Sequence, residues 1–314
     1  MKKYLFVLTI ILLIIGFTGC ERDNDNSPIN NDTHVEPFNN EGASPALFSV
    51  ADGRQVLFSK GNLQYCTNGS HLTANGDTAD GTFRFAEHQY DYIGQANANV
   101  SASYADWIDL LCWGSSGWHV EPWSEKDGDY DIESLCGSEA YADWGVYNAI
   151  SNGGNRPGMW RTLTHDEWDY LINQRAASTI DGTDSARYAE ATVAGTAGLI
   201  IFPDHFVRPD EIDSIVNINK NNFAIAFTDN IYTAEKWSLM ERVGAIFLPA
   251  AGFRGGTWIS TVGTGGSYWA STCNANRQAY ALLFISDLVN ASAECTYDKD
   301  RGYGRSVRLV RDAN

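Results

Sequence analysis

The alternation of apolar and polar positions along the chain predicts short strands. Residues 47–50 and 55–58 alternate on either side of Asp52-Gly53, a dipeptide that favours a tight turn, and they therefore predict a β-hairpin. The same period of two predicts further strands at residues 63–66 and 82–85, paired across a polar loop over 67–81, and at 189–202, 279–284 and 306–310.

Two segments show the spacing of amphipathic helices. The first begins at Thr164, which together with Glu167 has the sequence pattern of a capping box. The second covers residues 233–241. Residues 143–150 are compatible with a short helix, and residues 107–113 with a short helix or a turn. Strands and helices together predict an α+β domain with short antiparallel strands, two main helices and long loops.

The N-terminus has the features of an export signal. Lys2 and Lys3 precede an apolar run at residues 5–15, which is shorter than a helix that spans a bilayer. The segment that ends at Cys20, Phe-Thr-Gly-Cys, resembles a bacterial lipobox. We therefore expect a signal peptide over residues 1–19 and a lipid on Cys20. An uncleaved membrane anchor is the alternative.

The residues after this cysteine are polar and rich in asparagine and aspartate. Because they hold too little apolar surface to order themselves, residues 20–45 predict a flexible tether between the lipid and a domain over residues 46–314. Glu21 and the aspartates after it resemble the surface-export signal of Bacteroidetes lipoproteins, although a solvated tether has the same composition. The expected location is the outer membrane, with the domain exposed at the cell surface.

The size and charge of the exported chain limit its partners. About 270 residues suffice for one large domain with a substantial core. The formal charge of −17 becomes −19 when the two lysines of the signal peptide are removed. This acidity disfavours nucleic acid as a partner, and we expect membrane contact through the lipid alone.

An alternating acidic stretch is the one calcium-like pattern in the sequence. Asp127, Asp129 and Asp131 alternate as they do at the start of a calcium loop. Gly128 is misplaced for that motif and no glutamate closes a loop of the required length, so the stretch favours an ordinary exposed loop. We expect no metal and no cofactor.

Five cysteines remain once the lipidated one is set aside, an odd number that allows at most two disulfides. On spacing, the pairs to consider are Cys112 with Cys136 and Cys273 with Cys295. The alternative is that all of them, including Cys66, are buried as small apolar side chains. No Cys-x-x-Cys motif or His–Cys cluster indicates zinc.

Aromatic side chains are abundant, and many lie among glycines in residues 88–120. Exposed rings would form a platform for carbohydrate, because the C–H faces of sugars stack on aromatic faces. The alternative is that the rings fill the irregular interior of a loop-rich domain. The positions of the rings in the sequence do not distinguish these two roles.

The C-terminal stretch resembles a known fold. Residues 248–254 (LPAAGFR), 268–272 (YWAST) and 304–311 (GRSVRLVR) resemble the C-terminal half of the C-type-lectin-like fold. Residues 160–168 (WRTLTHDEW) resemble the W-R-L-P-T-x-x-E-W segment of its branch of formylglycine-generating enzymes and bacterial variable ligand-binding proteins. The resemblance runs from about residue 48 to residue 311 and extends to surface lipoproteins of Bacteroidetes. It implies a C-type-lectin-like domain, a fold that hosts enzymes, sugar binders and adhesion modules alike.

The resemblance also implies a binding function for the C-terminal loops. In the variable proteins the ligand surface lies between a Gly-Gly turn and the last strand, and the matching positions here are Trp258, Tyr268, Trp269, Asn274, Asn276, Arg277 and Tyr280. Rigid rings and adaptable amides suit recognition. We therefore expect a non-catalytic lipoprotein that binds a glycan or a protein. Burial of Tyr268 and Trp269, where they would only hold the loop in place, is the alternative for those two residues. The calcium and sugar motifs of animal C-type lectins are absent.

Two other functions remain open. One is a structural or adhesive subunit of a cell-surface assembly. The other is a degenerate formylglycine-generating-type oxidase. In that family two nearby cysteines bind copper, whereas Cys273 and Cys295 are too far apart in the sequence to match, and we assign no catalytic residue.

Overall fold

A computed structural model of the chain describes residues 37–125, 132–180, 185–219, 227–274, 278–285 and 301–313. All of them belong to one compact unit that extends from Val35 to Asn314. No helix among these residues is long and apolar enough to cross a membrane. The predicted lipid on Cys20 and the calcium-like pattern at residues 127–131 lie outside the described part of the chain.

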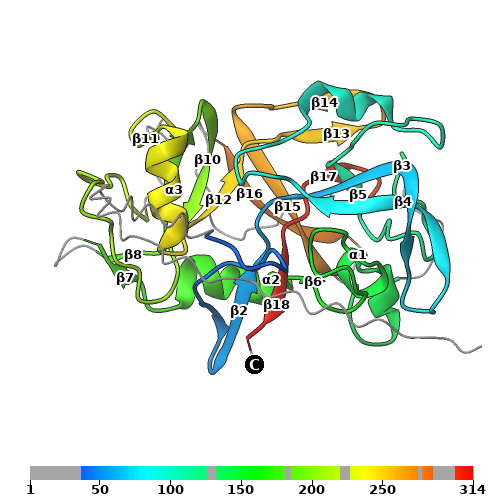
Figure 1. Cartoon of the computed structure of the whole chain (residues 1–314), viewed down its shortest axis with the longest axis horizontal. Helices are drawn as coiled ribbons and strands as arrows, with labels where there is room; N and C mark the ends of the chain where they lie inside the picture. The colour runs from blue at the N-terminus through cyan, green and yellow to red at the C-terminus, as the bar shows by residue number, and fades with distance from the viewer. Residues whose placement is uncertain are drawn as a thin grey trace, which may run out of the picture. The chain divides into compact units, whose positions relative to one another are not determined.

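The domain has an α+β fold with short helices and many short strands, as the sequence predicts (Figure 1). The helices are α1 (Trp144–Tyr147), α2 (His165–Asp169), its π-helical continuation η3 (Tyr170–Gln174), α3 (Ala234–Arg242) and the 3-10 segments η1 (Gly94–Asn99) and η2 (Gly137–Ala142). Within the described residues, the strands form three four-stranded sheets and three separate pairs. In the part of the chain that the structure describes, every pair of neighbouring strands in these sheets except one is antiparallel.

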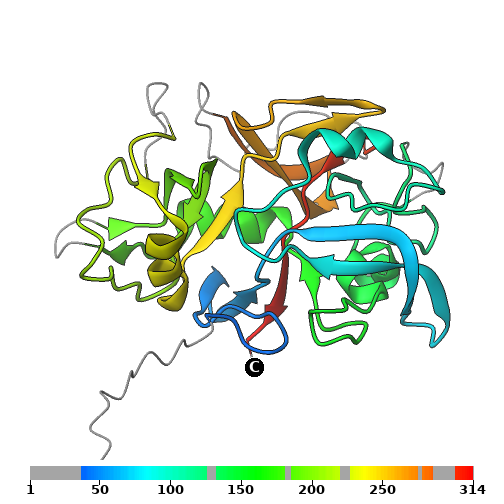
Figure 2. The same cartoon turned by 45° about the horizontal axis from the view of Figure 1, so that its top comes forward.

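One sheet joins the beginning and the end of the domain. Its strands, in order, are β1 (Phe48–Ala51), β2 (Arg54–Phe58), β18 (Leu309–Asp312) and β6 (Arg161–Thr162). The predicted β1–β2 hairpin is confirmed, and Gly53 supplies the positive φ of 69° that its turn requires. The C-terminal strand pairs with β2, so the red end of the chain lies against its blue beginning in Figure 2.

Several residues that the sequence assigns to the tether belong to this fold. The side chain of Asn39 accepts hydrogen bonds from the backbone N–H groups of Glu41 and Ala43, at 3.0 and 2.9 Å. Ala43 is fully buried and forms a β-bridge with Ser59. A polar segment can order here because the Asn39 side chain and the neighbouring strand satisfy its backbone donors.

The β3–β4 hairpin is longer than the sequence predicts. Strand β3 runs over Leu63–Leu72 and β4 over Thr78–Phe85, so most of the predicted polar loop at 67–81 is strand. The turn itself is short, and the backbone N–H of Thr73 donates to the carbonyl of Asp77 at 2.9 Å. The prediction was wrong because the polar outer half of this hairpin lacks the apolar face by which strands are recognised in a sequence.

A second sheet carries α3 on one face. Its order is β11 (Ile231–Tyr232), β9 (Tyr188–Val193), β10 (Thr196–Ile201) and β12 (Ile246–Pro249), with β11 parallel to β9. The single strand predicted over 189–202 is therefore a hairpin, which turns at Ala194 and Gly195, both with positive φ. Helix α3 lies beside β10 and β12 (Figure 1). The ring centroids of Trp237 in α3 and Phe247 in β12 are 5.5 Å apart.

Both predicted main helices are confirmed, and the first has the cap that the sequence predicts. The hydroxyl of Thr164 accepts from the backbone N–H of Glu167 at 3.1 Å, and the Glu167 carboxylate accepts from the backbone N–H of Thr164 at 2.9 Å. This is the reciprocal capping box that the sequence predicts. Thr233 caps α3 in the same way, by accepting from the backbone N–H of Lys236. Residues 107–113 form no helix and lead through a bridge at Ile108 into a short strand.

The C-terminal stretch contributes a third sheet and a hairpin. The sheet order is β14 (Trp258–Ser260), β13 (Phe253–Gly255), β17 (Gly304–Arg305) and β5 (Leu111–Cys112). The hairpin consists of β15 (Gly265–Cys273) and β16 (Ala279–Ile285), and the remaining pair is β7 (Ser178–Thr179) with β8 (Ser185–Ala186). The strand predicted at 306–310 starts later, at Leu309, because Ser306 bridges to Tyr268 of β15 instead.

The β15–β16 hairpin lies between two hydrophobic cores. Tyr268 and Leu282 belong to one cluster, which also holds Phe48, Phe58 and Trp168. The alternate residues Trp269 and Ala281 belong to a second cluster, and they pack there with Trp113, Trp144 and Trp160. Because successive side chains of a strand point to opposite faces, this hairpin is buried on both sides.

The first candidate disulfide pair, Cys112 with Cys136, is not formed. Cys66 and Cys136 carry free thiols, so Cys136 is not bonded to Cys112. The Cys112 sulfur lies 3.3 Å from Nη2 of Arg254 and 3.0 Å from the carbonyl oxygen of Ser124. The second predicted pair involves Cys295, which lies outside the described residues.

Candidate ligand-binding surfaces

Tyr268 and Trp269, two of the predicted ligand contacts, are core residues with exposures of 0% and 1%. The Tyr268 hydroxyl donates to the carbonyl of Pro249 at 2.8 Å and accepts from the Asn62 amide at 3.2 Å. The indole N–H of Trp269 donates to the carbonyl of Leu111 at 2.7 Å. Neither ring reaches the surface, so these residues hold the C-terminal strands together, and we do not retain them as ligand contacts.

Trp258 is the one predicted residue with a large exposed aromatic face. Its side chain is 51% exposed on β14. Its ring centroid lies 5.4 Å from that of Phe253 and 6.2 Å from that of Tyr303, in edge-to-face geometry, and Phe253 and Tyr303 are 5.9 Å apart. These three residues form what we call the aromatic platform.

The backbone and one cation fix the position of the platform. A Cβ atom on Gly255 would overlap the indole of Trp258, so the ring can lie over this residue only because it is glycine. The guanidinium of Arg305 lies 5.8 Å from the ring centroid of Phe253 and 4.9 Å from that of the buried Trp269. The platform is therefore connected to the core through edge-to-face ring contacts and the guanidinium of Arg305.

The other described members of the predicted site lie near the end of β15. The side-chain oxygen of Asn274 accepts from the backbone N–H of Gln278 at 3.0 Å, and this contact closes the turn between β15 and β16. Tyr280 is half-buried, with its ring centroid 4.2 Å from that of His165. Asn276 and Arg277 lie outside the described residues.

The predicted residues therefore do not form one surface. Gly252, next to the platform strand β13, bridges to Gly266 at the start of β15, whereas Asn274 follows the end of that strand. A strand of nine residues extends over roughly 30 Å. The aromatic platform and the Asn274–Tyr280 region consequently lie toward opposite ends of β15.

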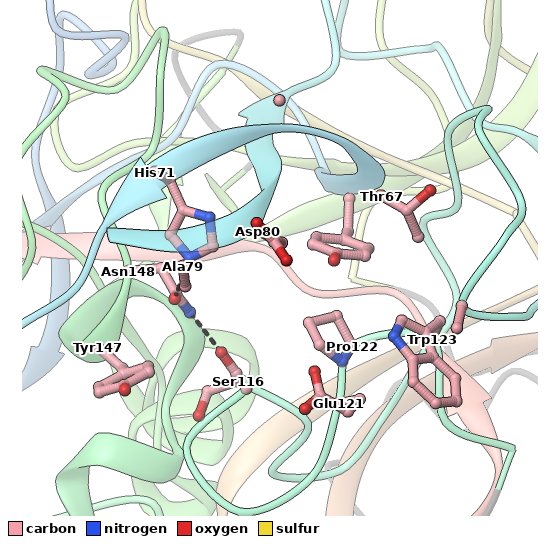
Figure 3. A pocket seen from close by; sticks show the side chains of 14 residues that line it. Thr67, His71, Ala79, Asp80, Ser116, Glu121, Pro122, Trp123, Tyr147 and Asn148 are labelled. Carbon is pink, nitrogen blue, oxygen red and sulfur yellow. Dashed lines mark hydrogen bonds between the residues drawn. The ribbon is translucent and has the colours of Figure 1, made fainter. Parts of the chain in front are cut away.

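A cavity that the sequence does not predict lies beside the β3–β4 hairpin (Figure 3). It has a volume of about 450 Å³ and is enclosed by side chains of the hairpin and of the segments around residues 116–123 and 147–148. Asp80 and Glu121 face each other across it, with Trp123 at one side and His71 at the other (Figure 3).

Several polar side chains of the cavity wall form hydrogen bonds within the protein itself. The two ring nitrogens of His71 lie 2.9 Å from the carbonyl oxygen of Gly81 and 2.7 Å from Oδ1 of Asn148. The Asn148 amide nitrogen donates to the carbonyls of Ser116 and Trp144 at 2.8 and 3.0 Å, which fixes the orientation of the amide. These bonds fix the side chains of His71 and Asn148. The carboxylates of Asp80 and Glu121 remain available to a ligand.

Sequence reasoning missed this cavity because its residues are far apart along the chain. The sequence predicts a loop for residues 67–81 of the hairpin, and no motif spacing links them to residues 116–148. Among the described residues, no group of three or more histidine, cysteine or acidic side chains is arranged to hold a metal ion. Comparison of the chain with protein-family models, with curated proteins and with solved structures gave no match.

Proposed function

We propose that this protein is an exported, lipid-anchored binding module that recognises a glycan through the aromatic platform of Phe253, Trp258 and Tyr303. The exposed ring of Trp258, fixed over Gly255 by two neighbouring rings, is the observation that carries the proposal. The export signal, the lipid on Cys20 and the C-type-lectin-like form of the α+β domain are parts of the proposal that rest on the sequence resemblance.

The geometry of the platform suits a sugar for physical reasons. An exposed indole gains free energy when an apolar surface covers it, and the C–H face of a pyranose is such a surface. The ring of Trp258 is already held by Phe253 and Tyr303, so little side-chain freedom is lost when a ligand binds. Thr257 is exposed and Ser260 half-buried beside it, and their hydroxyls offer hydrogen-bonding groups for sugar hydroxyls.

The test is a glycan-array screen of the full chain in detergent, with a parallel screen of host surface proteins. We expect a glycan hit whose affinity falls at least about tenfold in Trp258→Ala, which corresponds to about 1.4 kcal/mol. Trp107→Ala is the matched control, because Trp107 is a partly buried tryptophan outside the platform that stacks on Arg84 at 3.7 Å. The melting temperature of each variant separates loss of binding from loss of folding.

The other outcomes point to other functions. If a host protein binds and Trp258→Ala abolishes that binding, the aromatic platform remains the binding site, but its ligand is a protein and not a glycan. A hit that is insensitive to Trp258→Ala would reject the platform. If neither screen gives a hit, the result would favour a structural or adhesive subunit, or the oxidase alternative, over a binding module.

A further inference from the structure

The cavity beside the β3–β4 hairpin shares no residue with the aromatic platform, and its unpaired groups indicate a ligand of its own. Asp80 and Glu121 form no hydrogen bond or ion pair through their carboxylates with any residue in the described part of the chain. No lysine or arginine of that part lines the cavity. Two carboxylates thus face a shared space without a cation to balance them.

The hydroxyl of a largely buried tyrosine completes this acidic wall. Tyr65 is 3% exposed, and its hydroxyl lies against Gly81, where any larger residue would collide with it. Within the described residues this hydroxyl has no hydrogen-bond partner, although it lines the cavity. Burial first, and then the negative charges of Glu121 and Asp80, raise the pKa of Tyr65 to about 12. The effect of both carboxylates on Tyr65 agrees with their position across the same space.

The remaining polar groups of the wall cannot supply many donors to a ligand. His71 and Asn148 are committed to each other and to backbone oxygens, and the hydroxyl of Ser116 donates to the carbonyl of Tyr141. The charged side chains of the lining, Asp80 and Glu121, are therefore both acceptors, and the uncharged hydroxyls of Tyr65 and Tyr147 and the indole of Trp123 lie beside them. A ligand that satisfies them must be rich in donors and positively charged.

Aromatic rings supply the rest of the lining. Tyr65, Trp123 and Tyr147 all contribute to the wall of the cavity. Aromatic faces attract cations, most strongly where water is excluded. The volume of about 450 Å³ falls within the range of small-molecule sites.

We propose that this cavity binds a small organic molecule through a primary ammonium group. The ammonium lies between the carboxylates of Asp80 and Glu121 and donates its third hydrogen bond to the Tyr65 hydroxyl oxygen. The apolar part of the molecule packs against Trp123. A neutral molecule of the same shape binds more weakly, because it leaves both carboxylates unpaired.

Glucosamine and glucose are suitable probes, because they differ only in an amine and a hydroxyl at one carbon. We would titrate each into the full chain by calorimetry at about pH 6, where the amine carries its proton. A second ammonium probe, 1,5-diaminopentane, tests recognition of the charge without a sugar ring. The expected result is saturable binding of at least one ammonium probe, with glucosamine at least about tenfold tighter than glucose.

Single substitutions test whether the ammonium probes bind in this cavity. Glu121→Gln and Asp80→Asn should each weaken ammonium binding at least about tenfold, and Tyr65→Phe should weaken it less, because it removes one uncharged acceptor. Glu87→Gln is the matched control: Glu87 is exposed, lies outside the cavity, and its substitution removes the same charge. Because Asp80 and Glu121 are themselves exposed, their variants should fold with unchanged melting temperatures.

Three results would overturn the proposal. The first is equal affinity for glucose and glucosamine. The second is ammonium binding that Glu121→Gln and Asp80→Asn leave within about twofold of the parent. The third is no saturable binding of either ammonium probe; calcium binding lost in Glu121→Gln would then identify a cation site of a different kind.

Discussion

Arg308 is completely buried, and its Nη2 donates a hydrogen bond to the side-chain oxygen of Gln89 at 2.6 Å. The same guanidinium reaches the side-chain oxygen of Asn62 at 3.3 Å. The Gln89 oxygen also accepts from the backbone N–H of Phe247, at 2.8 Å. Burial lowers the pKa of Arg308 to about 10, which still leaves it charged at neutral pH. Three distant parts of the chain thus meet at one buried cation.

Replacement of Arg308 by methionine should destabilise the domain strongly. The methionine fills part of the space, but it leaves the side-chain oxygen of Asn62 without its donor and the oxygen of Gln89 with the backbone N–H of Phe247 alone. Because a buried acceptor is left unsatisfied, we expect a loss of about 1 to 3 kcal/mol in the free energy of unfolding, measured by urea denaturation. Arg156→Ala, which removes a 68% exposed arginine paired with Glu41 at 3.6 Å, should cost less than about 1 kcal/mol. Similar losses in the two variants would contradict a special role for the buried network.

Substitution of Tyr268 distinguishes a core role from a ligand role. Tyr268→Phe keeps the ring but removes the hydroxyl that bonds Pro249 and Asn62, and should cost about 1 to 3 kcal/mol of unfolding free energy. Tyr268→Ala should cost about 3 to 5 kcal/mol. Folded protein of either variant should bind a platform ligand with the affinity of the parent. A Tyr268→Phe variant with normal stability and lost binding would place the residue back at the ligand surface.

Glu190 should make stability depend on pH. This residue of β9 is 3% exposed, and neither carboxylate oxygen has a hydrogen-bond partner among the described residues. Burial, followed by the charge of Asp229, raises its pKa to about 8 from an ordinary value of 4.5. The folded state therefore keeps a proton that the unfolded chain releases, so stability present below about pH 4.5 is lost as the pH rises to about 8.

Glu190→Gln tests this effect, because glutamine cannot ionise. The variant should match the parent near pH 4.5 and become more stable than it toward pH 8, with a difference that grows by at most about 1.4 kcal/mol per pH unit. Asp109 and Asp143, whose pKa values burial raises to about 6, contribute equally to both proteins and cancel in the comparison. A constant difference between variant and parent from pH 5 to pH 8 would show that Glu190 does not titrate in this range.

The helix caps give a further stability test. Thr164→Ala and Thr233→Ala each remove an N-cap hydroxyl, and each should lower the free energy of unfolding by about 1 kcal/mol. Thr164→Ser and Thr233→Ser retain the hydroxyl and should lie within about 0.5 kcal/mol of the parent. Alanine variants as stable as the serine variants would show that neither cap contributes to stability.

Features that depend on neighbouring residues could be predicted from the sequence. The Asp52-Gly53 hairpin and the cap at Thr164 are local, because the turn conformation or the capping bond involves residues at most a few positions apart. The α+β class followed from the same local patterns. Of the proposed binding residues, Trp258 could be singled out in advance, although its exposure could not.

The tertiary structure decided which rings are exposed and where a cavity forms. Tyr268 and Trp269 follow Trp258 closely in the sequence, yet they are buried because β15 lies between two hydrophobic cores and has no solvent face. The cavity brings Asp80 and Glu121 together through folding of segments about forty residues apart. Burial and long-range proximity depend on how distant segments pack, and periodicity within one segment does not contain that information.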